Sequence, residues 1–134
     1  MTSLSGALIG TWELISREDR HPHGEIAPEP MLGSDPLGIL IYDSSGRFAL
    51  QLMKRKRGAK SGKRGYDAYF GTYVVDDKRG VVTQTLHAAL AAEHVGSVVT
   101  REMSVDGDAL TIHLNTANVA GEAVTRTLRW RRVA

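Results

Sequence analysis

The chain of 134 residues is 42% hydrophobic and 24% charged, and its formal net charge is +2. This length and composition are ordinary for one globular domain, which we expect to span residues 1–134. The absence of cysteine excludes disulfides and cysteine-ligated metals, and no apolar run approaches the ~20 residues that span a bilayer. Because the first residues also lack the features of a secretory signal peptide, we expect a cytoplasmic protein without a membrane span.

The first predicted strand, residues 8–20, contains the residue around which we expect the fold to be organised, Trp12. Alternation places Trp12 on one side of this strand and Arg17 on the other. Gly10 leaves room for another segment to approach the indole, so the ring can close one end of a β structure. A second tryptophan, Trp130, lies in the last predicted strand, and we interpret both rings as structural plugs. If the first and last strands are neighbours, the sheet is closed.

Short strands at meander spacing fill the rest of the chain. Turn residues separate them, and Asp106-Gly107 is the strongest hairpin signal. Residues 90–94 favour one helical turn, but no segment has sustained helical periodicity. After the first strand, the predicted strands are residues 37–42, 47–53, 69–75, 81–88, 97–105, 109–115 and 125–133. We therefore predict an all-β protein, an eight-stranded antiparallel up-and-down barrel that can enclose its own side chains or one small ligand.

The loop over residues 54–64 concentrates the positive charge of the chain. It contains seven basic side chains and no acidic one. Such runs bind the phosphates of nucleic acids or anionic membranes, but this run contains no aromatic residue before Tyr66, and no helix is available to enter a groove. We therefore interpret residues 54–66 as a flexible basic loop and expect no specific nucleic-acid partner. Binding to a nucleic acid or a membrane surface through this loop is a third functional hypothesis, behind the two given below.

Several segments, in order along nearly the whole chain, resemble motifs of the bacterial and fungal lipocalin-like domain family, which has a calycin-type barrel. These segments are Gly10–Ser16, Gly38–Arg47, Gln51–Met53, Tyr69–Tyr73, Arg101 with Asp106–Leu110, and Leu128–Arg132. The resemblance implies an eight-stranded up-and-down barrel but little about chemistry. It also implies that a basic side chain of the last strand caps Trp12, and Arg129 and Arg132 are both candidates. The loop at 54–64 is more basic than the family pattern.

Arg101 is the residue that we expect to tune ligand binding. It shares a predicted strand face with Val99 and Met103, and an unpaired guanidinium among apolar side chains is costly. It therefore forms a structural ion pair, with Glu18 or Glu102 as partner, or it meets an anionic group of a ligand in the barrel.

Tyrosines and one histidine are the other candidates for the interior. Among Tyr42, Tyr69 and Tyr73 we favour Tyr73, because Gly71 leaves room beside it for a ligand or an aromatic ring. His87 is the best-placed histidine for acid–base chemistry, because a strand would hold it rigidly, and a solvent-facing position is the alternative. The ligand-binding candidates are Tyr42, Tyr73, His87, Arg101 and Met103.

Two functional hypotheses follow from such a barrel. The first is binding of a small, largely hydrophobic molecule, with or without an anionic group, in the interior. The alternative is a cofactor-free isomerase, cyclase or hydratase of a hydrophobic metabolite, with Tyr73 as acid, Arg101 as anion holder and His87 as base. We expect no cofactor. We also expect no metal, because His21 and His23 lie on a turn without the rigid spacing of a metal site. The sequence leaves the ligand, any reaction and the oligomeric state open.

Overall fold

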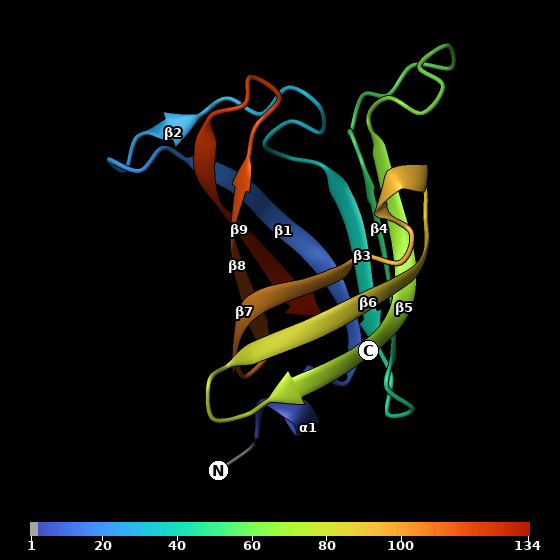
Figure 1. Ribbon diagram of the computed structural model, residues 1–134, viewed down its shortest axis with the longest axis vertical. Helices are drawn as coiled ribbons and strands as arrows, with labels where there is room; N and C mark the ends of the chain where they lie inside the picture. Colours follow the sequence, from blue (N-terminus) through green and yellow to red (C-terminus); the bar gives the residue numbers. More distant parts are fainter. Residues whose placement is uncertain (1–2) are drawn as a thin grey trace.

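The structure is a computed structural model that describes residues 3–134, and its strands form one closed antiparallel barrel (Figure 1). The elements in chain order are α1 (Leu4–Leu8), β1 (Gly10–Arg20), β2 (Ile26–Ala27), β3 (Leu37–Tyr42), β4 (Arg47–Met53), β5 (Tyr66–Asp76), β6 (Val81–Ala89), the 3-10 helix η1 (Ala92–His94), β7 (Val98–Asp106), β8 (Ala109–Ala117) and β9 (Ala123–Arg132). The strands are neighbours in the order β2-β1-β3-β4-β5-β6-β7-β8-β9, and a further pairing of β1 with β9 closes the sheet. Because β2 only pairs with the last two residues of β1, the barrel itself has the eight strands that the sequence predicts.

The differences from the predicted elements are small. The helical turn expected over residues 90–94 is η1, which covers Ala92–His94, whereas α1 and β2 were not predicted, and β5 begins at Tyr66 instead of Tyr69. Five residues of α1 are too short for a periodic signal, and its start is fixed by a local cap, in which Oγ of Ser3 accepts a hydrogen bond from the Gly6 amide. In the part of the chain that the structure describes, no helix has the length and apolar character needed to cross a bilayer.

β1 pairs with two neighbours and is interrupted by a bulge. Its first residues pair with β3, and nearly its whole length pairs with β9, with the register shifting between Leu14 and Ser16. Before the bulge Trp12 and Leu14 are buried, and after it Arg17 and Asp19 are buried. The expectation that Arg17 faces away from the Trp12 side is therefore wrong, because the bulge adds one residue to the alternation.

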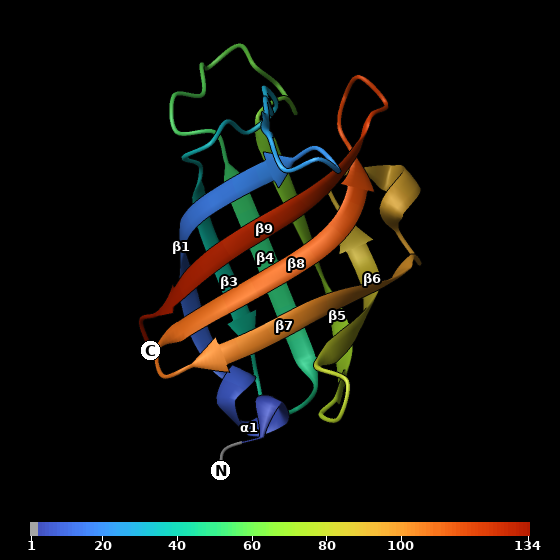
Figure 2. The same ribbon diagram turned by 90° about the vertical axis from the view of Figure 1, so that its left-hand side faces the viewer.

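Trp12 plugs the end of the barrel at which α1 lies (Figure 1, Figure 2). Its side chain is fully buried, and its Nε1 donates a hydrogen bond to the Leu8 carbonyl at 2.9 Å. The guanidinium of Arg132 lies over the indole, 4.3 Å from the ring centroid, and donates from Nη1 to the Ile9 carbonyl. Arg132 is therefore the basic cap that the family resemblance implies, whereas Arg129 is exposed.

The opposite end of the barrel is ringed by connections between strands. These connections are β2 with the segment that follows it, the loop at 54–65, η1 and the turn between β8 and β9 (Figure 1). The basic loop begins and ends as a hairpin, since the Lys54 amide donates to the Gly65 carbonyl at 2.7 Å. Its Arg55 forms an exposed ion pair with Asp35 at 3.0 Å. The charge of this loop therefore lies at the open end of the barrel, outside its interior.

Replacing Trp12 with alanine is expected to lower the free energy of unfolding by about 3–5 kcal/mol, because it removes a fully buried aromatic side chain. Urea denaturation followed by circular dichroism measures this difference between variant and parent. Ile15→Ala is the matched control, since Ile15 lies on the same strand but is exposed. If the Trp12 variant and the parent have the same midpoint urea concentration, the ring is not the plug.

Replacing residues 55–64 with Asn-Gly is expected to change the free energy of unfolding by less than about 1 kcal/mol. Lys54 and Gly65 already form a closing hydrogen bond, and loop length alters closure entropy slowly. The ion pair of Arg55 with Asp35 that is lost is exposed on both sides, so it contributes little. The same denaturation experiment measures the change, and a loss of several kcal/mol would contradict it. In a parallel titration, a salt-resistant oligonucleotide affinity that disappears with the loop would favour nucleic-acid binding as the function.

Candidate functional site

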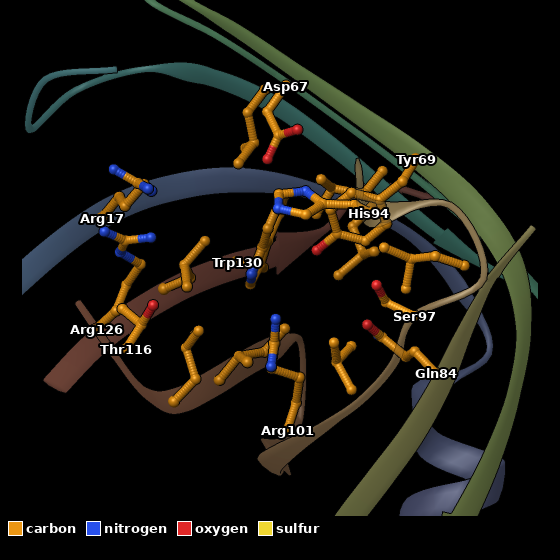
Figure 3. A pocket seen from close by; sticks show the side chains of 18 of the residues that line it. Arg17, Asp67, Tyr69, Gln84, His94, Ser97, Arg101, Thr116, Arg126 and Trp130 are labelled. Carbon is orange, nitrogen blue, oxygen red and sulfur yellow. The ribbon is translucent and has the colours of Figure 1, made fainter. Parts of the chain in front are cut away.

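A cavity of about 270 Å³ lies inside the barrel. Its apolar lining comes from several strands and includes Leu40, Leu50, Ile112 and Leu128. Its polar lining includes Arg17, Asp67, Gln84, Arg101 and Arg126, and Figure 3 shows these side chains around the cavity. This combination of an apolar wall and a few polar groups is typical of small-molecule sites.

Arg101 reaches the cavity from β7 (Figure 3). Its Nη1 donates to the carbonyl of Thr100 at 3.0 Å, and no carboxylate of residues 3–134 forms an ion pair with it. The two expected partners are occupied or distant: Glu18 pairs with Arg20 at 2.7 Å, and Glu102 is exposed on the other face of β7. The expected structural ion pair is therefore absent from the described chain, and the guanidinium faces the cavity.

Two further arginines lie together at one side of the cavity (Figure 3). Nε and Nη2 of Arg126 donate to the two oxygens of the buried Asp19 carboxylate at 2.7 and 2.9 Å. Nη1 of Arg17 lies 3.1 Å from Oε2 of Glu29, but neither this atom nor Nε makes a hydrogen bond with the described residues. Burial lowers the pKa of Arg17, as does the nearby charge of Arg126, while Glu29 and Asp19 raise it.

Gln84 and Tyr42 meet across the interior and form a directed chain of hydrogen bonds. Nε2 of Gln84 donates to Oη of Tyr42 at 2.5 Å, and this hydroxyl donates to Sδ of Met103 at 3.9 Å. Burial raises the pKa of Tyr42 well above its usual value, so the phenol keeps its proton. Oε1 of Gln84 is left buried without a hydrogen-bond partner in the described chain, and Nε1 of Trp130 is in the same situation.

Of the residues expected in the interior, Tyr42 and Arg101 line the cavity and Met103 lies buried behind Tyr42. Tyr73 packs edge-on against the Tyr42 ring, with 4.8 Å between centroids, but its hydroxyl donates to the Asp43 carbonyl at 2.7 Å. Tyr73 therefore contributes packing to the core, and its hydroxyl is turned to the β3–β4 connection.

The expected interior position of His87 is wrong. β6 buries Val82, Gln84 and Leu86, and alternation then leaves His87 exposed on the outer face, with Nε2 3.5 Å from Oγ1 of Thr72. The same alternation is visible in the sequence, where Gln84 shares a strand face with Val82 and Leu86. This pattern could have identified Gln84 as an interior residue. Arg126 offers a similar signal, since it lies on the same face of β9 as the buried residues Leu128 and Trp130, whereas Arg17 offers none because of the bulge.

A second hollow of about 520 Å³ adjoins the cavity at the open end of the barrel. The two spaces share four lining residues, Arg17, Asp67, His94 and Arg126, which therefore lie at the boundary between them. Burial raises the pKa of Asp67, although the Ala68 amide, His94 and both arginines act in the opposite direction. Charged side chains therefore lie between the hollow at the open end and the apolar wall of the cavity.

Comparisons with known proteins agree with this architecture. No curated protein matches the chain. Among solved structures, bovine odorant binding protein in complex with a selenium-containing odorant superposes with a TM-score of 0.52 at 12% sequence identity, covering 100% of this chain and 75% of that one. At this identity the similarity concerns the fold alone. The family model described as the lipocalin-like domain matches residues 9–133, which confirms the resemblance seen in the sequence, and the chain therefore belongs to the lipocalin-like domain family.

Proposed function

We propose that the protein binds a small, largely hydrophobic molecule that carries an anionic group, and that it does so inside the barrel. The observation that carries this proposal is the Arg101 guanidinium, which faces a largely apolar cavity without a carboxylate partner among residues 3–134. A cation in such surroundings attracts an anionic group more strongly than it does in water, because the local dielectric constant is low. The fold shared with the bovine odorant binding protein, which holds an odorant, supports an interior site.

The other two arginines that line the cavity, Arg17 and Arg126, are less available to a ligand. Arg126 is held by both oxygens of Asp19, and Arg17 lies against Glu29. Breaking the Arg126–Asp19 pair would leave a buried carboxylate without its partner, which is costly. Arg101 is the interior guanidinium that can accept an anion without the loss of an existing ion pair.

Binding is supported better than the enzyme hypothesis. That hypothesis requires Tyr73, Arg101 and His87 to converge on one point within hydrogen-bond reach. The Tyr73 hydroxyl is engaged with a backbone carbonyl, and the His87 ring lies outside the barrel. Only Arg101 of the three lines the cavity, so we do not propose this reaction for the protein.

Replacing Arg101 with methionine is expected to weaken the binding of anionic ligands by ~1.5–3 kcal/mol, the range for a lost hydrogen bond to a charged group. Anilinonaphthalene sulfonate and octanoate are the anionic probes, octanol is the neutral probe, and isothermal titration calorimetry measures all three. Octanol is expected to bind parent and variant equally well. Arg79→Met removes an exposed arginine from the turn between β5 and β6 and is the matched control.

Two outcomes would contradict the proposal. Equal weakening of anionic and neutral probes by Arg101→Met would mean that the substitution damages the barrel instead of removing an anion contact. If the parent binds none of the three probes saturably, the cavity is not a site for apolar molecules.

A further inference from the structure

We infer that the interior site selects a carboxylate that carries a hydroxyl group close to its acid end, joined to an apolar tail. This inference rests on the proposed function, because it assumes that Arg101 holds the anionic group. It names the class of ligand more narrowly by assigning a second recognition element, the side-chain carbonyl of Gln84, to the hydroxyl.

The first step concerns the free acceptor on Gln84. The side chain is 3% exposed and lines the cavity, and its Oε1 has no hydrogen-bond partner among the described residues. In the structure Nε2 is the amide atom that lies 2.5 Å from Oη of Tyr42, and this hydroxyl lies 3.9 Å from Sδ of Met103. The oxygen is therefore the atom of Gln84 that remains for a ligand, and it requires a donor.

The second step concerns the distance between this acceptor and the cation. In the pairing of β6 with β7, Gln84 lies opposite Val99 and Arg101 lies opposite Val82. Gln84 and Arg101 are therefore diagonal neighbours on the same face of the sheet, a relation that places the two residues roughly 7–8 Å apart and their Cβ atoms somewhat closer. Both side chains line the same cavity (Figure 3). One ligand that places a carboxylate on Arg101 thus has its nearest carbon atoms within range of the Gln84 carbonyl.

The third step concerns which substituent satisfies that carbonyl. A hydroxyl donates to it and removes the cost of a buried acceptor without a partner, whereas a methylene leaves that cost in place. A keto oxygen would bring a second acceptor against the first and is disfavoured. The expected order of affinity is therefore hydroxy acid, then unsubstituted acid, then keto acid of the same chain length.

The test uses the parent protein and a series of eight-carbon acids in calorimetric titrations. The probes are octanoate, 2-hydroxyoctanoate, 3-hydroxyoctanoate, 8-hydroxyoctanoate and 3-oxooctanoate. We expect the 2-hydroxy or the 3-hydroxy acid to bind about tenfold more tightly than octanoate. This gain is the size expected when a hydrogen bond satisfies a buried acceptor that has no other partner. The 8-hydroxy acid is expected to show no advantage, because its hydroxyl lies at the far end of the tail.

Gln84→Met removes the acceptor while keeping the length of the side chain. In this variant the 2-hydroxy and 3-hydroxy acids and octanoate are expected to bind with affinities that agree within about twofold. Thr83→Val is the matched control, since Thr83 is the adjacent residue of β6 and its side chain lies on the other face, and it is expected to keep the tenfold preference. The ligand series on the parent protein tests the inference even if Gln84→Met does not fold.

The outcomes separate this inference from the proposed function. If octanoate binds but hydroxylation near the carboxylate brings no gain, the inference is overturned and the interior anion site stands. If 3-oxooctanoate binds more tightly than the hydroxy acids, the amide presents its NH₂ to the ligand and the assignment of Oε1 is overturned. If no acid of the series binds, the proposed function itself fails.

Discussion

The double pairing of β1 is the constraint on which the whole barrel depends. β1 lies between β3 and β9, and this position joins the first strand to the last and removes the free edges of the sheet. The bulge after Leu14 lets residues of different parity in the two halves of β1 face the interior. Its first half buries Trp12 at the closed end, and its second half turns Arg17 and Asp19 inward. Asp19 then lies opposite Arg126 of β9, so the strands that close the barrel are also joined by a buried ion pair.

The interior charges link the barrel wall to the segment that crosses its open end. Oε2 of Glu29, 3.1 Å from Arg17, also accepts hydrogen bonds from the amides of Leu32 and Gly33. Leu32 belongs to the hydrophobic core, although it lies outside any long strand. One carboxylate and one buried leucine therefore help to hold this segment at the mouth of the barrel. A guanidinium that has lost most of its hydration is held there by a charge from a loop, not from the sheet.

The sequence predicts those features that depend on local pattern. Alternation and turn residues are enough for the eight strands, and a Trp in the first strand is enough for the plug, whereas its basic cap was implied by the family resemblance. Prediction from the sequence fails where one extra residue changes the alternation, or where a side chain contacts a residue that is distant in the sequence. The inward turn of Arg17 depends on a bulge, and the Tyr73 hydroxyl is held by a carbonyl 30 residues away. Gly71 was expected to leave room for a ligand, but a Cβ there would collide with the Thr85 carbonyl at the β5–β6 bulge.

The positions of the buried polar atoms that lack hydrogen-bond partners help to distinguish a binding cavity from a core that is merely incompletely packed. In the described chain, the buried side-chain nitrogen and oxygen atoms without a hydrogen-bond partner belong to Arg17, Gln84 and Trp130. An unpaired neutral group such as the Gln84 carbonyl costs about 1–3 kcal/mol, and native proteins contain few of them. A barrel that needed only stability would place apolar side chains at these positions, as it does at the neighbouring Leu86 and Leu128. All three residues line the same cavity, so the cost is concentrated where a ligand with complementary groups would remove it.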